Sequence, residues 1–180
     1  MSLNGVGHLA GKNIAVTGAG NGIGRAIALA CAAEGAKVVV ADYGVSMEGS
    51  DPSSEVADAV VAEIAAAGGT AIAVAGDVSE MEVGQRIVDT AVENWGSIDG
   101  VVCVAGIVRE RMLFNMSEEE FDHVVGVHLK GHFTLYKAAS AVMRKQETGG
   151  SLVGFTSGAF VASTAQANYS AAKGGIVSLT

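Results

Sequence analysis

The sequence predicts an α/β fold: a doubly wound, mostly parallel sheet with helices on both faces. Three observations predict this class. Short β-branched runs alternate with longer amphipathic stretches, the runs are apolar on both faces, and glycines mark the joins between them. Strands that are apolar on both faces are typical of a parallel sheet buried between helices, and strand–helix alternation implies right-handed crossovers.

The elements follow one another in a regular order. Strands are expected at 13–18 (NIAVTG), 36–42 (AKVVVAD), 70–78 (TAIAVAGDV), 98–106 (IDGVVCVAG) and 151–157 (SLVGFTS). Helical patterns lie near 22–34, 53–67, 79–94, 117–145 and 168–180. Ser117 and Glu120 predict a capping box at the start of the long fourth helix, because each side chain can bond the other's main-chain N–H.

Composition excludes several classes of protein. The 180 residues suit a single domain, 1–180, and no apolar run approaches the roughly 18–20 residues needed to cross a bilayer. The opening residues lack a basic segment followed by an apolar one, so no secretory signal is expected. Cys31 and Cys103 are the only cysteines, which favours a reducing, cytoplasmic setting. A net charge of −8 argues against general nucleic-acid binding.

The last helical pattern stops at Thr180 with neither a glycine cap nor a following strand. Because folds of this kind close with further strands, we expect the chain to lack the C-terminal part of its domain.

The turn after the first strand predicts a phosphate site. Gly18, Gly20, Gly22 and Gly24 separate that strand from its helix in the pattern T-G-x-x-x-G-x-G. Glycine lets a backbone approach a ligand closely, and the following helix points free N–H groups at the same place. No Gly-Lys-Ser/Thr follows, so this is not a P-loop. The alternative is a tight turn without a ligand.

Asp42, at the end of the second strand, favours NAD over NADP. A carboxylate there can accept hydrogen bonds from the adenosine ribose and would repel a 2′-phosphate. Tyr43 and Gly44 follow, without a Lys or Arg to neutralise such a phosphate, and Asn21 is uncharged. Taken alone, Asp42 could equally be a solvated loop acid. The other predicted cofactor contacts are Ile23 in the turn, Asp77 and Val78 after the third strand, and Ala105 and Gly106 after the fourth. Asp77 could hold the adenine edge or could simply begin the next helix.

Tyr169 and Lys173 are candidates for acid–base chemistry, with Ser157 at the end of the fifth strand. The i, i+4 spacing puts the phenol and the ammonium on one helix face. A free tyrosine has a pKa of about 10, and a nearby ammonium lowers it by stabilising the phenolate. Such a phenol can exchange a proton with a carbonyl or alcohol oxygen while a nicotinamide exchanges hydride. The alternative is an ordinary exposed helix pair.

Together these residues resemble the short-chain dehydrogenase/reductase family. TGAGNGIG matches its cofactor turn, YSAAK its Tyr-x-x-x-Lys and LVGFTSGA its serine strand, and the likeness runs from about Lys12 to Thr180. The resemblance implies a Rossmann-like domain, an NAD(P) cofactor and interconversion of a secondary alcohol and a ketone. It also implies that Tyr169 is the acid/base, that Lys173 binds the nicotinamide ribose and lowers the phenol's pKa, and that Ser157 steadies the substrate oxygen.

Three departures from the family pattern stand out. Cys103 and Val104 replace two asparagines of Asn-Asn-Ala-Gly, which puts a sheet-bracing hydrogen-bond set in doubt. His128, in VHLKG, replaces an Asn that helps to hold a water chain to the active-site lysine, so we place His128 in the catalytic set as its substitute. The distance from Ser157 to the tyrosine is one residue short of the commonest spacing, on which Thr156 would align instead; we favour Ser157 from its place in the strand.

The VHLKG segment also looks like hydroxyacyl-CoA dehydrogenase parts of peroxisomal multifunctional enzymes and like oxoacyl reductases. We therefore expect a small-molecule alcohol or ketone substrate, an acyl thioester among the candidates, with no nucleic-acid or membrane partner. The family commonly forms tetramers, so a homo-oligomer, dimer or homotetramer, is expected.

No metal is predicted, because His123, His128 and His132 have no obvious Cys or carboxylate beside them. Two rivals remain: an S-adenosylmethionine-dependent methyltransferase and a non-catalytic NAD-binding or scaffold protein.

Overall fold

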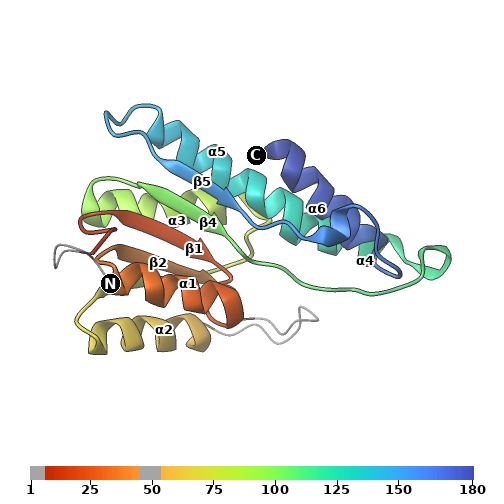
Figure 1. Ribbon diagram of the computed structural model, residues 1–180, viewed down its shortest axis with the longest axis horizontal. Coiled ribbons are helices and arrows are strands. Elements are labelled where there is room, and N and C mark those ends of the chain that lie inside the picture. Colours follow the sequence, from red (N-terminus) through yellow and green to blue (C-terminus); the bar gives the residue numbers. More distant parts are fainter. Residues whose placement is uncertain (1–6, 45–53) are drawn as a thin grey trace.

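The computed structural model describes residues 7–44 and 54–180. Its centre is a parallel sheet with the strand order β3-β2-β1-β4-β5 (Figure 1). The strands are β1 (Asn13–Thr17), β2 (Lys37–Asp42), β3 (Thr70–Ala75), β4 (Gly100–Cys103) and β5 (Ser151–Gly154). The chain builds outward from β1 to β3 and then returns to the other side of β1 for β4. This reversal confirms the predicted doubly wound fold and creates a switch point between β1 and β4.

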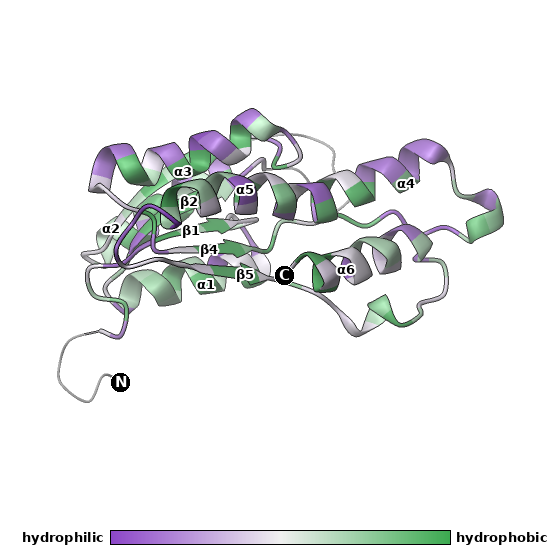
Figure 2. Ribbon diagram, turned by 90° about the horizontal axis from the view of Figure 1, so that it is seen from above, coloured by the Kyte–Doolittle hydropathy of each residue, from purple (hydrophilic) through white to green (hydrophobic). Residues whose placement is uncertain are grey.

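Helices cover both faces of the sheet. Helices α1 (Gly22–Ala33) and α2 (Glu55–Ala66) lie on one face, and α3 (Met81–Trp95) and α5 (Gly131–Met143) on the other (Figures 1 and 2). Helices α4 (Glu118–Val125) and α6 (Ala167–Leu179) lie side by side beyond the carboxyl ends of the strands. Residue 53, the expected start of the second helix, lies outside the described residues. Within the described ranges, no helix is both long and apolar enough to span a membrane.

The central strands are buried on both sides, as their unbroken apolar runs predict. All of β1 is buried, and Val38, Val39 and Val40 of β2 are fully shielded from solvent. Alternate residues enter different cores: Val39 packs into the cluster beneath α3 and α5, and Val38 and Val40 into the one beneath α1 and α2. Several strands end before their apolar patterns do, because main-chain pairing stops where the chain leaves the sheet to form the loops of the site.

The long helical pattern at 117–145 is interrupted in the middle. The predicted capping box is present: Ser117 Oγ accepts from Glu120 N at 3.1 Å, and Ser117 N donates to Glu120 Oε2 at 2.9 Å. The π-helical turn η2 (Gly126–Lys130) then separates α4 from α5. A π turn inserts one extra residue into a helix and often occurs at functional sites. Here it carries His128.

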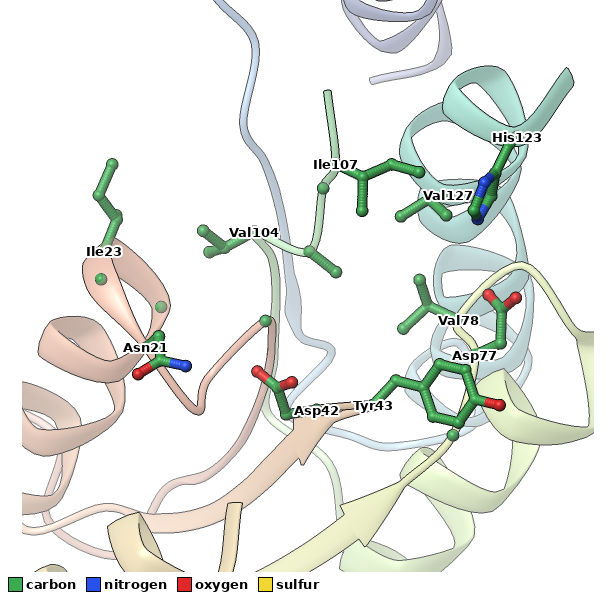
Figure 3. Close-up of a pocket in the computed structure, with 16 residues that line it drawn as sticks. Asn21, Ile23, Asp42, Tyr43, Asp77, Val78, Val104, Ile107, His123 and Val127 are labelled. Atoms are coloured by element: carbon green, nitrogen blue, oxygen red, sulfur yellow. The ribbon is translucent and has the colours of Figure 1, made fainter. Parts of the chain in front are cut away.

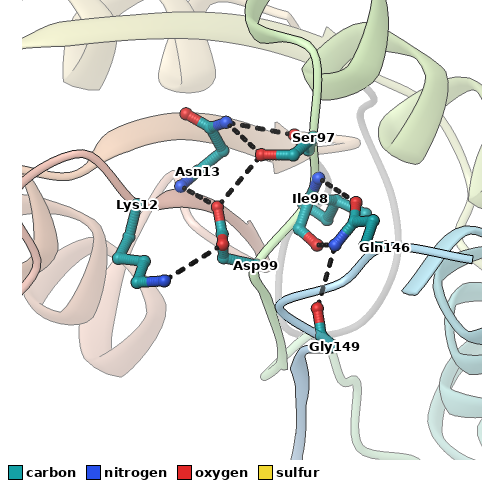
Figure 4. A network of polar contacts seen from close by, with 7 residues as sticks. All are labelled: Lys12, Asn13, Ser97, Ile98, Asp99, Gln146 and Gly149. Atoms are coloured by element: carbon teal, nitrogen blue, oxygen red, sulfur yellow. Dashed lines mark hydrogen bonds and ion pairs between the residues drawn. The ribbon is translucent and has the colours of Figure 1, made fainter. Parts of the chain in front are cut away.

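A polar network fastens the edge of the sheet opposite the site (Figure 4). Asn13 donates from Nδ2 to Ser97 and from its main-chain N to Asp99, whose carboxylate also pairs with Lys12 at 3.3 Å. Gln146 accepts from the N–H of Ile98 and donates to its carbonyl, each at 3.0 Å. These bonds join the amino ends of β1 and β4 to the loop before β5, which fixes the register of the strands that deliver the site.

Candidate active site

A cavity of about 580 Å³ opens at the carboxyl edge of the sheet, over the switch point between β1 and β4 (Figure 3). Ligands of doubly wound folds bind at this place. Ten predicted cofactor contacts line it: Gly18, Asn21, Gly22, Ile23, Gly24, Asp42, Asp77, Val78, Ala105 and Gly106. Segments far apart in the sequence therefore converge on one cavity.

The glycine turn lets α1 start directly against the cavity. Gly18 has a φ of +63°, and a Cβ there would lie 2.8 Å from the main chain of Ala105. A Cβ on Gly24 would lie 2.0 Å from the Gly18 carbonyl oxygen. The N-cap residue, Asn21, makes no side-chain capping bond, so it leaves the first N–H groups of α1 to other acceptors. These features fit a pyrophosphate, which needs close backbone approach and free N–H donors.

Asp42 presents a carboxylate to the same cavity. Its Oδ2 accepts from Gly20 N at 2.7 Å, and its Oδ1 accepts from Gly44 N at 2.6 Å. Among the described residues that line the cavity there is no Lys or Arg. Asp42 can therefore accept hydrogen bonds from a ribose hydroxyl. The described lining holds no cation that could pair with an additional phosphate on that ribose.

Asp77 combines the two roles considered for it. It lines the cavity, and its Oδ1 accepts from Ser79 N at 2.8 Å in the turn that leads into α3. Figure 3 places Asp77 and Val78 across the cavity from Asn21. Its second carboxylate oxygen has no bond to this turn, so the turn does not exhaust its capacity to accept hydrogen bonds.

Thr17 braces the sheet edge beside the positions of the two substituted asparagines. Its Oγ1 accepts from the N–H groups of Val104 at 3.1 Å and Ala105 at 3.3 Å. These bonds join β1 to the loop after β4, so the sheet edge stays closed without an amide side chain. Burial raises the pKa of the Cys103 thiol to about 12, so this residue packs as a small neutral core group.

His128 lies between the cavity and the helix that carries the tyrosine. Its Nε2 is 2.8 Å from the Ile107 carbonyl oxygen and 3.2 Å from the Ile107 nitrogen, and its Nδ1 is buried without a partner. Burial first, and then the charge of Lys173, lower the pKa of His128 to about 4, so the ring is neutral near pH 7. Gly106 is required beside it, because a Cβ would lie 2.2 Å from the His128 ring.

Tyr169 and Lys173 lie together on α6, as their spacing predicted. Lys173 Nζ is 5.3 Å from the centre of the Tyr169 ring, and that ring meets His128 edge-on with 5.1 Å between ring centres. Lys173 is only 4% exposed, and its ammonium donates to the Phe155 carbonyl at 2.6 Å. Burial lowers the pKa of Lys173 to about 8, which leaves it mainly charged at pH 7. Tyr169 and Lys173 do not line the cavity itself; His128 connects them to its wall.

The two candidate hydroxyls differ in their partners. Both lie beyond β5, which ends at Gly154, so the predicted position of Ser157 within the fifth strand is wrong. Thr156 Oγ1 donates to the Lys173 carbonyl at 3.0 Å, which commits its proton to holding the segment after β5 against α6. Ser157 Oγ accepts from Ala159 N at 3.3 Å, so its own proton has no recorded acceptor in the described chain. This difference favours Ser157 as the hydroxyl that can donate to a substrate oxygen.

Sequence reasoning missed several residues of the site. Tyr43, Gly76, Val104, Ile107, His123 and Val127 also line the cavity. His123 and Val127 are four residues apart, so the helix period could have placed them on one face. Asn168, fully buried, donates to the carbonyls of Arg109 and Glu120 at 3.0 Å each and accepts from Tyr169 N. No local pattern signals these long-range bonds.

The histidines considered for a metal do not form a cluster. His123 lines the cavity, whereas both nitrogens of His132 bond the main chain. In the ranges 7–44 and 54–180, no three His, Cys, Asp or Glu residues lie close enough together to hold a metal ion.

Fold and site together define a doubly wound α/β protein with a cavity at its switch point that is suited to a dinucleotide. The profile of the short chain dehydrogenase family matches residues 12–180, and the chain belongs to that family. The family uses a nicotinamide cofactor, NAD or NADP. Membership favours the oxidoreductase prediction over the methyltransferase one.

Named relatives point in the same direction. The chain is 46% identical to hydroxyacyl-CoA dehydrogenase ChsB1 of Mycobacterium tuberculosis, over 96% of this chain and 55% of the relative. It is 44% identical to the mouse peroxisomal multifunctional enzyme type 2, over 94% and 23% respectively. A short chain dehydrogenase structure from Mycobacterium avium superposes with a TM-score of 0.90 at 49% identity, over 97% of this chain and 62% of that one. The chain thus spans about half or less of these two curated relatives.

Proposed function

We propose that this protein is an NAD-dependent oxidoreductase that interconverts a secondary alcohol and a ketone by hydride transfer. The observation that carries this proposal is the position of the buried Lys173 ammonium, 5.3 Å from the centre of the Tyr169 ring. His128 contacts that ring and lies between it and the wall of the cavity. A structural helix pair would not require a buried charge, because burying an ammonium is costly.

The chain's own residues divide the chemistry among them. A bound nicotinamide supplies the hydride acceptor for oxidation, or the donor for reduction. Tyr169 takes the alcohol proton, or gives one to the carbonyl oxygen, at its phenolic oxygen. Ser157 donates a hydrogen bond to the same substrate oxygen. Lys173 places its ammonium beside the phenol and would also hold the ribose hydroxyls of a bound cofactor, while His128 fixes the loop at Ile107.

NAD is the proposed cofactor, with NADP less favoured. Asp42 offers acceptors to the 2′- and 3′-hydroxyls of the adenosine ribose, and its negative charge repels a 2′-phosphate. The described lining of the cavity contains no Lys or Arg that could offset this repulsion. Asn21 and the first turn of α1 would hold the pyrophosphate, and Asp77 and Val78 the adenine.

A 3-hydroxyacyl or 3-oxoacyl thioester is the proposed substrate class. The support is the printed names of relatives: a hydroxyacyl-CoA dehydrogenase at 46% identity and a 3-oxoacyl-[acyl-carrier-protein] reductase of Synechocystis at 43%. The reductase match covers 92% of this chain and 64% of that relative. Steroids and small secondary alcohols are the competing classes.

We also propose a homo-oligomer, dimer or tetramer, joined through the outer faces of α5 and α6. Exposed Phe133 of α5 and Leu179 of α6 line an apolar groove of about 440 Å³ there. Single large apolar side chains are ordinary on a surface, but two beside an apolar groove favour a contact. Light scattering of the full-length protein tests this.

A reducing compartment such as the cytoplasm is proposed from the two free thiols, Cys31 and Cys103.

Spectroscopic assay of the full-length protein tests the proposed function. NAD reduction at 340 nm would be followed with 3-hydroxyacyl-CoA thioesters of several lengths, hydroxysteroids and simple secondary alcohols, with NADP in parallel. We expect turnover with NAD on at least the thioesters. NADH binding without turnover on any of these alcohols would favour the non-catalytic NAD-binding alternative. Binding of S-adenosylmethionine, but not of NADH, would favour a methyltransferase.

A further inference from the structure

His132 directly joins two parts of the site through its two ring nitrogens. It lies in the first turn of α5 and is 1% exposed. Its Nδ1 is 2.6 Å from the carbonyl oxygen of His128, and its Nε2 is 3.3 Å from the main-chain nitrogen of Phe155. The ring therefore bridges the π turn that carries His128 and the segment that follows β5.

The two bonds fix the ring's tautomer. The Phe155 N–H can only donate, so Nε2 of His132 must accept. The proton is then on Nδ1, which donates to the His128 carbonyl. A doubly protonated ring would turn an N–H toward the N–H of Phe155. Burial, and then the charge of Lys173, lower the pKa of His132 to about 4, in agreement with a neutral ring.

Phe155 transmits this constraint to the lysine. The residue is held on its N–H side by His132 and on its carbonyl side by the Lys173 ammonium, at 2.6 Å. The other end of the bridge reaches His128, whose ring meets the ring of Tyr169. The His132 ring thus sets the position of Phe155, which holds Lys173, relative to the π turn, whose His128 packs against Tyr169.

We propose that His132 is a positioning residue: by tying Phe155 to the π turn, it sets where the Lys173 ammonium lies relative to the Tyr169 phenol. This inference rests on the proposed function for its catalytic consequence, but its structural content concerns Lys173 itself. The competing explanation is core packing, because His132 also contacts the Tyr136 ring at 5.8 Å and lies where a Cβ on Gly154 would touch it.

Two substitutions test the two hydrogen bonds of the His132 ring separately. The amide of Gln reaches about as far as Nε2, so His132→Gln can keep the acceptor for Phe155. The amide of Asn reaches about as far as Nδ1, so His132→Asn keeps only the bond to His128. Tyr136→Phe is the matched control, since it removes the hydroxyl near Thr180 and leaves a neighbouring aromatic ring in the same core.

The first measurement, on the full-length protein without cofactor, is the NMR titration of the Lys173 ε-carbon, assigned by its loss in Lys173→Met. The midpoint is expected near 8 in the parent, in His132→Gln and in Tyr136→Phe. In His132→Asn it should rise by about half a unit or more, because a released ammonium regains water. An unchanged midpoint in His132→Asn would overturn the proposal.

The second measurement is steady-state oxidation with NAD. His132→Asn should lose about tenfold in kcat with little change in the KM for the alcohol, and His132→Gln should recover most of the loss. Equal losses in both variants, tracking only their thermal stability, would favour core packing and contradict the proposal. If the parent shows no turnover, the proposed function fails, and the Lys173 titration still decides the role of His132.

Discussion

The Lys173 ammonium lies 5.3 Å from the centre of the Tyr169 ring while its own hydrogen bond goes to the Phe155 carbonyl. The charge is therefore anchored by the strand side of the site and lies beside the phenol ring. Folding keeps a costly buried cation at this place.

Lys173→Met should separate function from stability. The thioether chain keeps the packing of the lysine stem but removes the charge, so we expect kcat to fall about 100-fold or more. The free energy of unfolding should change by no more than about 1 kcal/mol, because the lost bond to Phe155 is offset by the desolvation that a neutral chain avoids. Lys173→Arg, which retains charge but not shape, should not restore activity. Urea unfolding and NAD-linked kinetics check this; parent-like turnover in Lys173→Met would contradict it.

Asp42→Asn should relax the choice of cofactor. The amide has one acceptor oxygen in place of two and no charge, so the ribose hydroxyls lose affinity and a 2′-phosphate is no longer repelled. We expect the ratio of kcat/KM for NAD over NADP to fall about tenfold or more. Asp77→Asn, across the same cavity, is the control and should weaken both cofactors alike. An unchanged ratio in Asp42→Asn would show that this carboxylate does not select NAD.

Gly24→Ala should disrupt the cofactor turn. Its Cβ would lie 2.0 Å from the Gly18 carbonyl, so α1 has to move away from the turn, at a cost of about 2 kcal/mol or more. NADH affinity should fall with it. Gly174→Ala is the matched control: it is helical, has open space around its Cβ, and should be neutral or slightly stabilising. Urea unfolding compares the two, and equal stabilities would refute the close packing at Gly24.

Acid should destabilise the fold through His128 and His132. Burial lowers the pKa of each to about 4, below the unfolded value near 6.5. Above pH 6.5 neither state is protonated at these rings. As the pH falls from 6.5 to 4, these histidines bind protons in the unfolded state but not in the folded state. The free energy of unfolding therefore falls, by up to about 3 kcal/mol for each ring.

The double variant His128→Asn, His132→Gln should therefore show a shallower fall in stability between pH 6.5 and 4. Guanidinium unfolding at a series of pH values measures these slopes, and equal slopes for the parent and the double variant would show that the buried rings are protonated as readily as free ones.

The sequence was sufficient for the parts of the fold that depend on local pattern. The apolar runs of β1 and β2 located the sheet, and the glycines after β1 located the cavity, since each signal depends on neighbouring residues. Asp42 and Asp77 were found because strand ends converge in any doubly wound sheet.

Features made by distant residues were not predictable. Thr17 accepts from Val104, 87 residues away, and so braces a sheet edge that the loss of two asparagines had put in doubt. The π turn at Gly126–Lys130 lies within an apolar period that continues on both sides, so the pattern at 117–145 indicated one unbroken helix. The sequence predicted no metal at His132 but gave no other role for it, because its partners are main-chain atoms that sequence does not reveal.

Tyr169→Phe tests the central claim most directly. The substitution keeps the ring that packs against His128 and removes only the oxygen that would exchange the proton. In the full-length protein with NAD and the best alcohol, we predict that hydride transfer followed at 340 nm slows about 10²–10⁴-fold while NADH binds with parent affinity. A Tyr169→Phe protein that binds NADH normally and turns over at the parent's rate would contradict the account.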